Sequence, residues 1–452
     1  MIGCKYIISF FYNNAIITIM LLLALLLQTI DKNMYVIVEY ESNYYLFSHY
    51  SEGDHMPLFD KCDNYHIAND MIDAGLYPYF HELESRQDVE VMMEGSRKIM
   101  LGSNNYLGLT VHPEVIDAGV EALKKYGSGC SGSRFLNGTL DLHTKLEKNL
   151  ADFLNKEECV TFSTGFQSNL AIISGITEHG DYILNDRENH ASIYDGCKLS
   201  FAKVLRYKHN DMDDLEYQLK KIPEDKGKLI VTDGVFSMSG DIAKLPQIVD
   251  IAKKYKARVM VDDAHGFGVI GKGGRGTASY FDLENEVDII MGTFSKSLAS
   301  LGGYMAASKK VAHYVRHNSR PFIFSASIPP SCCATAIKAL EVIDREPERV
   351  ARLGDLAEYF RKALRAKGLK LKDSESGGDR IPIIPIYTYD QIATLQICKE
   401  LYEAGVYVNS VLPPAAPEGE CMIRTSLMAT HTEALIDEAV EIIDSVLKRY
   451  LG

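Results

Sequence analysis

The chain contains no tryptophan, no cysteines spaced as metal ligands and no excess of basic residues. The missing tryptophan indicates nothing about function. A formal net charge of −13 argues against a nucleic-acid partner, because phosphate binding needs a basic surface. The nine cysteines include the adjacent pair Cys332 and Cys333 but no C-x-x-C spacing. This pattern indicates reduced thiols in a reducing compartment such as the cytoplasm, rather than disulfides or a metal site.

The length and the order of the expected elements predict a two-domain α/β protein. At 452 residues the chain exceeds one ordinary core, and an apolar share of 46% is typical of a globular protein. From residue 106 to about 329, apolar strand-like runs alternate with helical stretches, which predicts a mostly parallel sheet covered on both faces. We expect an N-terminal extension at 1–55, an arm at 56–105, a large domain at 106–330 and a smaller α+β domain at 331–452.

The smaller domain is expected to carry Arg424 back toward the large one, and a cleft between two domains is a natural place for a cofactor. Its expected helices cover residues 333–343, 349–366, 391–403 and 432–448, and its expected strands lie at 383–387 and near 406 and 423.

Lys296 follows an apolar run at 287–291 and lies among small hydroxyl residues that include Thr293. A lysine at the end of a buried strand can form a Schiff base, and the hydroxyls can bind a phosphate, which is the arrangement that pyridoxal 5'-phosphate (PLP) needs. Asp262 and His265 follow a second strand at 258–261, where an acid can pair with a protonated ring nitrogen. A solvated lysine, a helix-capping acid and a structural histidine are the alternatives.

Two more polar clusters follow predicted strands. Residues 163–169 form a small-residue turn between a strand and a helix, where free backbone N–H groups favour a phosphate, although many such turns bind nothing. His190 follows the apolar run at 182–184 and is placed to stack on a flat ring. Because the carboxyl ends of parallel strands meet at one edge of a sheet, we expect all four clusters to converge there.

At this density of motifs the chain resembles the α-oxoamine synthases, PLP enzymes that condense an amino acid with an acyl-CoA and release carbon dioxide. The matching stretches run in family order from about residue 70 to the C-terminus: 102–109, 127–139, 162–169, 189–193, 232–238, 261–265, 292–300 and 423–431. The resemblance implies a large PLP-dependent aminotransferase-like domain (fold type I), a smaller C-terminal domain and a homodimer with a shared active site.

The resemblance also implies a role for each matching residue. Lys296 is expected to bind PLP covalently, Asp262 to pair with its ring nitrogen, His190 to stack on the ring and His265 to contact the phenolic oxygen. The phosphate is expected to bind Gly165, Phe166 and Thr293, and also Ser325 and Ala326 of the neighbouring subunit. Arg424 is expected to bind the substrate carboxylate, with a surface salt bridge as the alternative, and Asn105 to line the amino-acid pocket.

Within the family, the motifs at 131–139, 162–168 and 293–300 are most similar to members that use L-serine and a long-chain acyl-CoA such as palmitoyl-CoA. The implied product is 3-ketosphinganine, the first committed intermediate of sphingolipid synthesis. The alternatives are glycine C-acetyltransferase, aminolevulinate synthase and 8-amino-7-oxononanoate synthase. A non-catalytic partner subunit is disfavoured, because the lysine, the acid and both histidines are all present.

The first 55 residues do not match the family. No charged residue occurs from 6 to 30, and that length can span a bilayer. Three interpretations compete: a membrane anchor on the cytoplasmic side, an export signal, or upstream sequence translated from a wrongly assigned start codon. An export signal needs a basic N-terminal region and a small-residue cleavage site. Here Lys5 is the sole basic residue before the apolar segment and no such cleavage site follows, which disfavours export. Met34 and Met56 are the alternative starts. An anchor would suit an enzyme with a long-chain product.

Overall fold

The computed structural model describes most of the chain after residue 57. The described residues are 8–9, 38–40, 43–45, 58–371, 378–413, 415–417 and 419–451. They divide into two units, Met1–Ala74 and Gly75–Gly452. The first contains the short strands β1 (Ile8–Ser9), β2 (Val38–Tyr40) and β3 (Asn43–Tyr45) and the helices α2 (Asp60–Asp63) and α3 (Ile67–Asp73).

The possible membrane segment at 6–30 lies outside the described residues, apart from Ile8 and Ser9. No helix within the described ranges combines the length and the apolar character that a membrane crossing requires. Membrane association and the position of the start codon therefore stay predictions.

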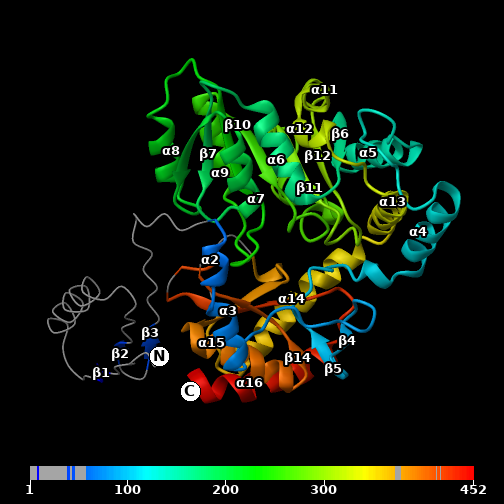
Figure 1. The fold of residues 1–452 in the computed structure, drawn as a ribbon. Coiled ribbons are helices and arrows are strands. Elements are labelled where there is room, and N and C mark those ends of the chain that lie inside the picture. Colours follow the sequence, from blue (N-terminus) through cyan, green and yellow to red (C-terminus); the bar gives the residue numbers. More distant parts are fainter. Residues whose placement is uncertain are drawn as a thin grey trace. The chain divides into compact units, whose positions relative to one another are not determined.

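A seven-stranded sheet forms the centre of the second unit, in the order β6-β12-β11-β10-β9-β7-β8 (Figure 1). The strands are β6 (Glu158–Phe162), β7 (Tyr182–Asp186), β8 (Lys203–Tyr207), β9 (Lys228–Asp233), β10 (Arg258–Asp262), β11 (Ile289–Thr293) and β12 (Gly303–Ala307). Only β12 runs antiparallel to its neighbours. The predicted α/β class with a mostly parallel sheet is confirmed.

Both faces of this sheet are covered, because alternate residues of each strand enter different cores. On β10, Val259 and Val261 belong to one core and Met260 to the other. The Met260 core is completed by α6 (Gly165–Ile176), α7 (Ala191–Leu199), α11 (Lys309–Asn318) and α12 (Arg320–Ile323). The opposite face receives α5 (Asp141–Phe153), α8 (Met212–Leu219), α9 (Leu245–Tyr255), α10 (Thr277–Tyr280) and α13 (Pro330–Arg345), and α4 (Pro113–Tyr126) packs against α13.

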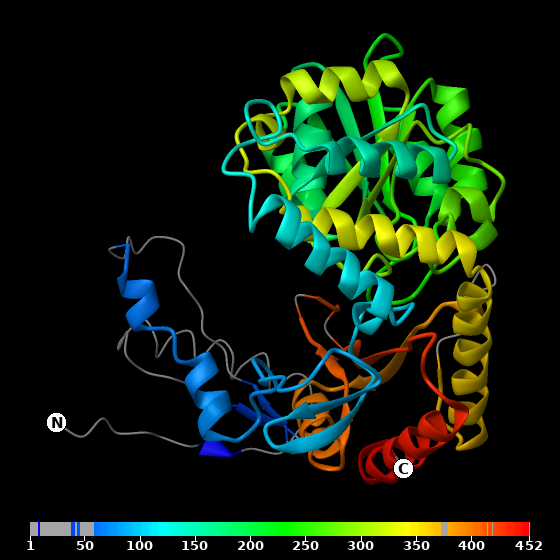
Figure 2. The ribbon, with the colours of Figure 1, turned by 90° about the vertical axis from the view of Figure 1, so that its right-hand side faces the viewer.

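Two smaller, three-stranded sheets lie below the large sheet in the view of Figure 2. One has the order β13-β16-β15 and is antiparallel, and the other has the order β14-β5-β4. Their elements are β4 (Glu90–Met93), β5 (Ser96–Met100), β13 (Ile383–Tyr389), β14 (Val406–Tyr407), β15 (Asn409–Val411) and β16 (Cys421–Ser426), with α14 (Glu348–Ala366), α15 (Gln391–Glu403) and α16 (Glu433–Leu451). Single 3-10 turns occupy Leu109–Val111, Lys272–Gly274 and Gly378–Arg380.

The helices and strands predicted for the C-terminal region agree with these elements. The sequence did not reveal that β5 joins them: Ile99 pairs with Val406 in parallel, although more than 300 residues separate the two. Residues 90–100, predicted as an arm, thereby pair with the smaller C-terminal elements. The domain boundary at residue 330 stays a prediction.

Candidate active site

The polar clusters that follow β6, β7, β10 and β11 meet at one edge of the large sheet, as predicted. They surround a cavity of about 270 Å³. The cavity is lined by Thr164, Gly165, Phe166, Asn169, His190, Ser192, Asp233, Val235, Asp262, Ala264, His265, Met291, Thr293, Ser295, Lys296, Leu301 and Gly302. The carboxyl ends of adjacent parallel strands therefore place an amine, two carboxyl groups and two imidazoles around one space.

Lys296 lies on a loop whose two ends are joined. Thr293 of β11 pairs with Gly303 of β12, and the N–H of Phe294 donates to the carbonyl of Gly302 at 2.9 Å. Phe294 and Leu298 are fully buried and pack this loop against the hydrophobic core. Nζ of Lys296 has no hydrogen-bond or ion-pair partner among the described residues. Burial, with the charge of Arg424, lowers the pKa of Lys296 to about 8 despite the opposing effect of Asp262. An amine of this kind is a nucleophile near neutral pH.

Asp262 is held as a hydrogen-bond acceptor at the end of β10. Asn169 Nδ2 donates to its Oδ2 at 2.7 Å, and the backbone N–H of Ala264 donates to its Oδ1 at 3.0 Å. Only 4% of Asp262 is exposed. Two donors stabilise a carboxylate in the charged form, so Asp262 can pair with a cation inside the cavity.

Asn169 also connects Asp262 to His190, which the sequence did not predict. Its Nδ2 donates to Ser192 Oγ at 2.8 Å, and Ser192 Oγ lies 2.7 Å from His190 Nδ1. Burial lowers the pKa of His190, and Lys296 adds to the effect while Asp262 opposes it. His190 is therefore a neutral flat ring at pH 7 whose orientation is fixed from one side. The sequence signal that could have indicated this connection is Asn169 itself, a polar residue among the apolar residues of α6. Such a residue needs hydrogen-bond partners when it is buried, and the structure buries it fully.

The N-terminus of α6 faces the cavity and provides free donors. Thr164 caps the helix by accepting from the N–H of Gln167 at 3.1 Å, so the N–H groups of Gly165 and Phe166 have no partner within the helix. A Cβ at position 165 would lie 2.7 Å from Thr293 Oγ1, which explains the glycine. Thr293 Oγ1 lies 2.9 Å from Ser295 Oγ. Two N–H groups at a helix N-terminus beside two hydroxyls fit a phosphate.

Arg424 lies on β16, in the sheet β13-β16-β15. It is connected to the cavity by a chain of contacts through Tyr106 to His265. Its Nη2 donates to Tyr106 Oη at 3.4 Å and to Asn104 Oδ1 at 3.1 Å, and its Nε donates to the carbonyl of Ser237 at 2.5 Å. Tyr106 Oη lies 2.6 Å from His265 Nδ1. Arg424 is 5% exposed and forms no ion pair among the described residues, which excludes the alternative of a surface salt bridge within this chain.

Four predicted site residues do not line this cavity: Arg424, Asn105, Ser325 and Ala326. Asn105 Nδ2 donates to Thr110 Oγ1 at 2.7 Å, while its neighbour Asn104 contacts Arg424. Ser325 Oγ accepts a hydrogen bond from Gln167, and the carbonyl of Ala326 accepts one from Ser163. Roles for these residues stay predictions.

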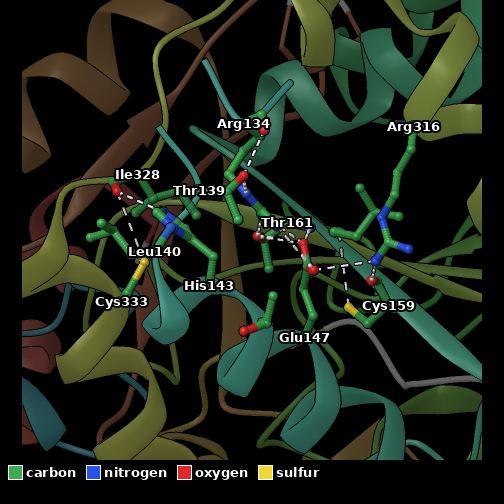
Figure 3. A network of polar contacts seen from close by, with 12 residues as sticks. Arg134, Thr139, Leu140, His143, Glu147, Cys159, Thr161, Arg316, Ile328 and Cys333 are labelled. Atoms are coloured by element: carbon green, nitrogen blue, oxygen red, sulfur yellow. Dashed lines mark hydrogen bonds and ion pairs between the residues drawn. The ribbon is translucent and has the colours of Figure 1, made fainter. Parts of the chain in front are cut away.

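A second polar network, shown in Figure 3, fixes the loop at 127–139. Glu147 of α5 accepts from Arg134 Nη1 at 2.7 Å and from Nη2 at 3.1 Å, and the backbone N–H of Thr161 donates to it at 2.9 Å. Arg316 Nη2 adds a contact at 3.2 Å. Although burial favours its neutral form, the hydrogen bond and charge of Arg134 lower the pKa of Glu147.

This network ties together two loops that lie beside the α6 N-terminus. Ser133 and Ala326 form an antiparallel bridge, the N–H of Ser327 donates to the carbonyl of Gly132 at 2.9 Å, and His143 Nε2 lies 2.9 Å from the carbonyl of Ile328. The loop at 127–139 and the loop at 324–328 are therefore joined by backbone contacts.

Comparison with known proteins identifies related chains. A family model described as aminotransferase class I and II matches residues 96–443. The serine palmitoyltransferase of Sphingobacterium spiritivorum is 51% identical over 87% of this chain and 97% of its own length. The 8-amino-7-oxononanoate synthase of Thermoanaerobacter pseudethanolicus is 40% identical over 83% of this chain and 94% of its own length. A solved structure of serine palmitoyltransferase from S. paucimobilis, a lysine-to-alanine variant with a bound PLP–myriocin aldimine, is 37% identical with a TM-score of 0.84 and covers 87% of this chain and 99% of that chain.

Proposed function

The chain belongs to the class I and II aminotransferase family, and we propose that it acts as a serine palmitoyltransferase, condensing L-serine with a long-chain acyl-CoA such as palmitoyl-CoA. It is a PLP-dependent acyltransferase. The products are 3-ketosphinganine, CoA and carbon dioxide. The observation that supports this proposal best is the convergence of Lys296, Asp262, His190 and the α6 N-terminus on one cavity. The greater identity to a serine palmitoyltransferase than to an 8-amino-7-oxononanoate synthase favours the serine reaction.

The residues of the cavity fit PLP. Lys296 would bind the aldehyde carbon covalently, and the N–H groups of Gly165 and Phe166, with Thr293, would hold the phosphate. Asp262 would accept a hydrogen bond from the ring nitrogen, and His190 would fix the plane of the ring. When bound, PLP withdraws electrons from the α carbon of an amino acid, and a protonated ring nitrogen increases that effect.

Proton transfer falls to Lys296. Because burial lowers its pKa to about 8, a large share of the free amine is neutral near pH 8 and can take the α proton of the amino acid at Nζ. Burial lowers the pKa of His265 well below its ordinary value, so its ring is neutral and Nδ1 pairs with Tyr106.

The substrate carboxylate would bind Arg424. A guanidinium that is 5% exposed and lacks an acidic partner in the described part of the chain leaves a buried charge uncompensated. Such a charge is costly, and an anionic ligand removes that cost. Its hydrogen bonds to Asn104 and Tyr106 fix its position, and Tyr106 in turn contacts His265 of the cavity lining.

The experiment that tests this proposal crosses serine, glycine, alanine and threonine with acetyl-CoA and palmitoyl-CoA in an assay of the purified enzyme. We expect serine with palmitoyl-CoA to have the highest kcat/KM. Faster turnover of glycine with acetyl-CoA would identify a glycine C-acetyltransferase, and preference for alanine would favour an 8-amino-7-oxononanoate synthase.

We also propose a homodimer. The joined loops carry large apolar side chains on their outer surface: Phe135 is 49% exposed, Leu136 is 78% exposed and Phe324 is 78% exposed. A second copy would cover them and bring Ser325 and Ala326 toward its phosphate. Sedimentation of the wild-type chain should give a dimer, and Leu136→Asp with Phe324→Asp should give monomers that bind PLP more weakly. A wild-type monomer with full activity would contradict this proposal.

A further inference from the structure

The cavity contains a second carboxyl group for which the proposed chemistry has no use. Asp233 ends β9 and Asp262 ends β10, and the two residues are partners in the parallel register. Neighbouring strands lie about 4.8 Å apart, so the two carboxyl groups are close. Asp233 is 3% exposed and Asp262 is 4% exposed. Two carboxylates this close and this poorly hydrated cannot both be ionised near neutral pH.

Hydrogen bonding decides which of the two is ionised. Asp262 accepts from Asn169 at 2.7 Å and from the N–H of Ala264 at 3.0 Å. Among the described residues, the Asp233 carboxyl group accepts from one donor, the N–H of His190, at 3.3 Å. Donors stabilise the charged form of a carboxyl group. The negative charge therefore belongs on Asp262 and the proton on Asp233.

The other charged groups around Asp233 do not reverse this assignment. Lys296 favours the ionised form of Asp233, whereas Asp186 on β7 and the ionised Asp262 oppose it. Burial is the largest effect, and together with Asp262 it raises the pKa of Asp233 well above its ordinary value. Asp263, the next residue along β10, has its own donors in the N–H and the hydroxyl of Thr277, at 2.7 and 2.6 Å.

We propose that Asp233 is a positioning residue that carries a proton, so that the pair of acids presents one negative charge, on Asp262, and one O–H donor to the cavity. The meaning of this pair for catalysis rests on the proposed function, since the single charge is the one that would meet the ring nitrogen of PLP. The protonation itself is a property of the chain and exists without substrate.

Infrared difference spectroscopy tests this directly, because a protonated carboxyl group has a carbonyl stretch that a carboxylate lacks. The full chain is titrated with and without PLP, as wild type and as Asp233→Asn, Asp262→Asn and Asp263→Asn. Asp233→Asn should remove a carboxyl band present at neutral pH. Asp262→Asn should keep that band but lower its midpoint by about one pH unit or more, because the neighbouring charge is gone. This shift is one that a merely structural role of Asp233 would not produce.

The variant Asp263→Asn is the control that separates the infrared band of Asp263 from that of Asp233. Burial raises the pKa of Asp263 to about 7, so Asp263→Asn should remove a different band with a midpoint near that pH. A carboxyl band at neutral pH that Asp233→Asn leaves at its full wild-type intensity would overturn the inference, as would a midpoint that does not respond to Asp262→Asn. If Asp233→Asn fails to fold, the Asp262→Asn titration still decides. Because these spectra need no substrate, a wrong substrate assignment leaves their result unchanged.

A second readout uses the bound cofactor. Asp233→Asn, which is neutral like the protonated acid, should bind PLP within about threefold of the wild type and keep its visible absorbance. Asp233→Glu keeps the acid but lengthens it, and Asp262→Asn removes the charge. Equal loss of PLP absorbance in Asp233→Asn and Asp262→Asn would show that both acids are ionised and would contradict the proposal.

Discussion

Replacing Glu147 by glutamine tests the buried network of Figure 3. The side chains of Glu147 and Arg134 are only 7% and 8% exposed, and their two hydrogen bonds are 2.7 and 3.1 Å long. Glutamine keeps one oxygen for the N–H of Thr161 but turns an NH₂ group toward a guanidinium. Arg316 retains Glu158, so the unpaired charge falls on Arg134. Removing one partner of a buried pair costs about 3–5 kcal/mol, and we expect a loss near the lower end of that range.

Urea unfolding of Glu147→Gln is compared with that of Lys148→Ala on the same helix. The Lys148–Asp152 pair has side chains that are 75% and 65% exposed, so its loss should change the unfolding free energy by about 0.5 kcal/mol or less. Hydrogen exchange at Ser327 gives a local measure, because its N–H donates to the carbonyl of Gly132 in the loop that Arg134 anchors. Equal midpoints for both variants, with unchanged exchange at Ser327, would refute the reasoning.

Three further predictions concern the cavity and the pH dependence. Lys296→Ala should abolish turnover and the pyridoxyl adduct that borohydride leaves on the wild-type peptide; an adduct on the variant would place the linkage elsewhere. Arg424→Lys should raise the KM for the amino acid at least about tenfold, because lysine cannot reproduce a two-pronged contact, while the KM for acyl-CoA should change little. Burial opposes the charge on His209, yet its contacts with Asp186 and Asp241 raise its pKa to about 9 from an ordinary value of 6.5. Its stabilising effect is therefore complete below pH 6.5 and is lost as pH rises through 9. The midpoint temperature of thermal unfolding of the wild type should fall over that interval, and that of His209→Gln should fall less.

The sequence was sufficient to predict the large sheet and the residues at its edge. Apolar runs that each end in a polar cluster locate Lys296, Asp262 and His190, because the carboxyl ends of parallel strands necessarily meet. The connection through Asn169 and the pairing of Asp233 with Asp262 could not be predicted, since they depend on the face of a helix and on strand register. Asn104, rather than Asn105, contacts Arg424, and both lie in a loop where no helical or strand period predicts the direction of a side chain.

The pairing of β5 with the smaller C-terminal elements also could not be predicted from the sequence. Its partner Val406 lies more than 300 residues away, and a short strand carries no information on which distant edge it will join.

The pairing of Thr293 with Gly303 has a consequence for the lysine between them. A nine-residue tether closed at both ends keeps the amine of Lys296 at a high effective concentration next to the cavity, whether or not it is covalently attached to anything. The same nitrogen can therefore serve first as the attachment point and then as the base, with no diffusive search between the two tasks. Cutting the tether, for example by circular permutation at Leu301, should slow reattachment far more than it weakens binding of free PLP.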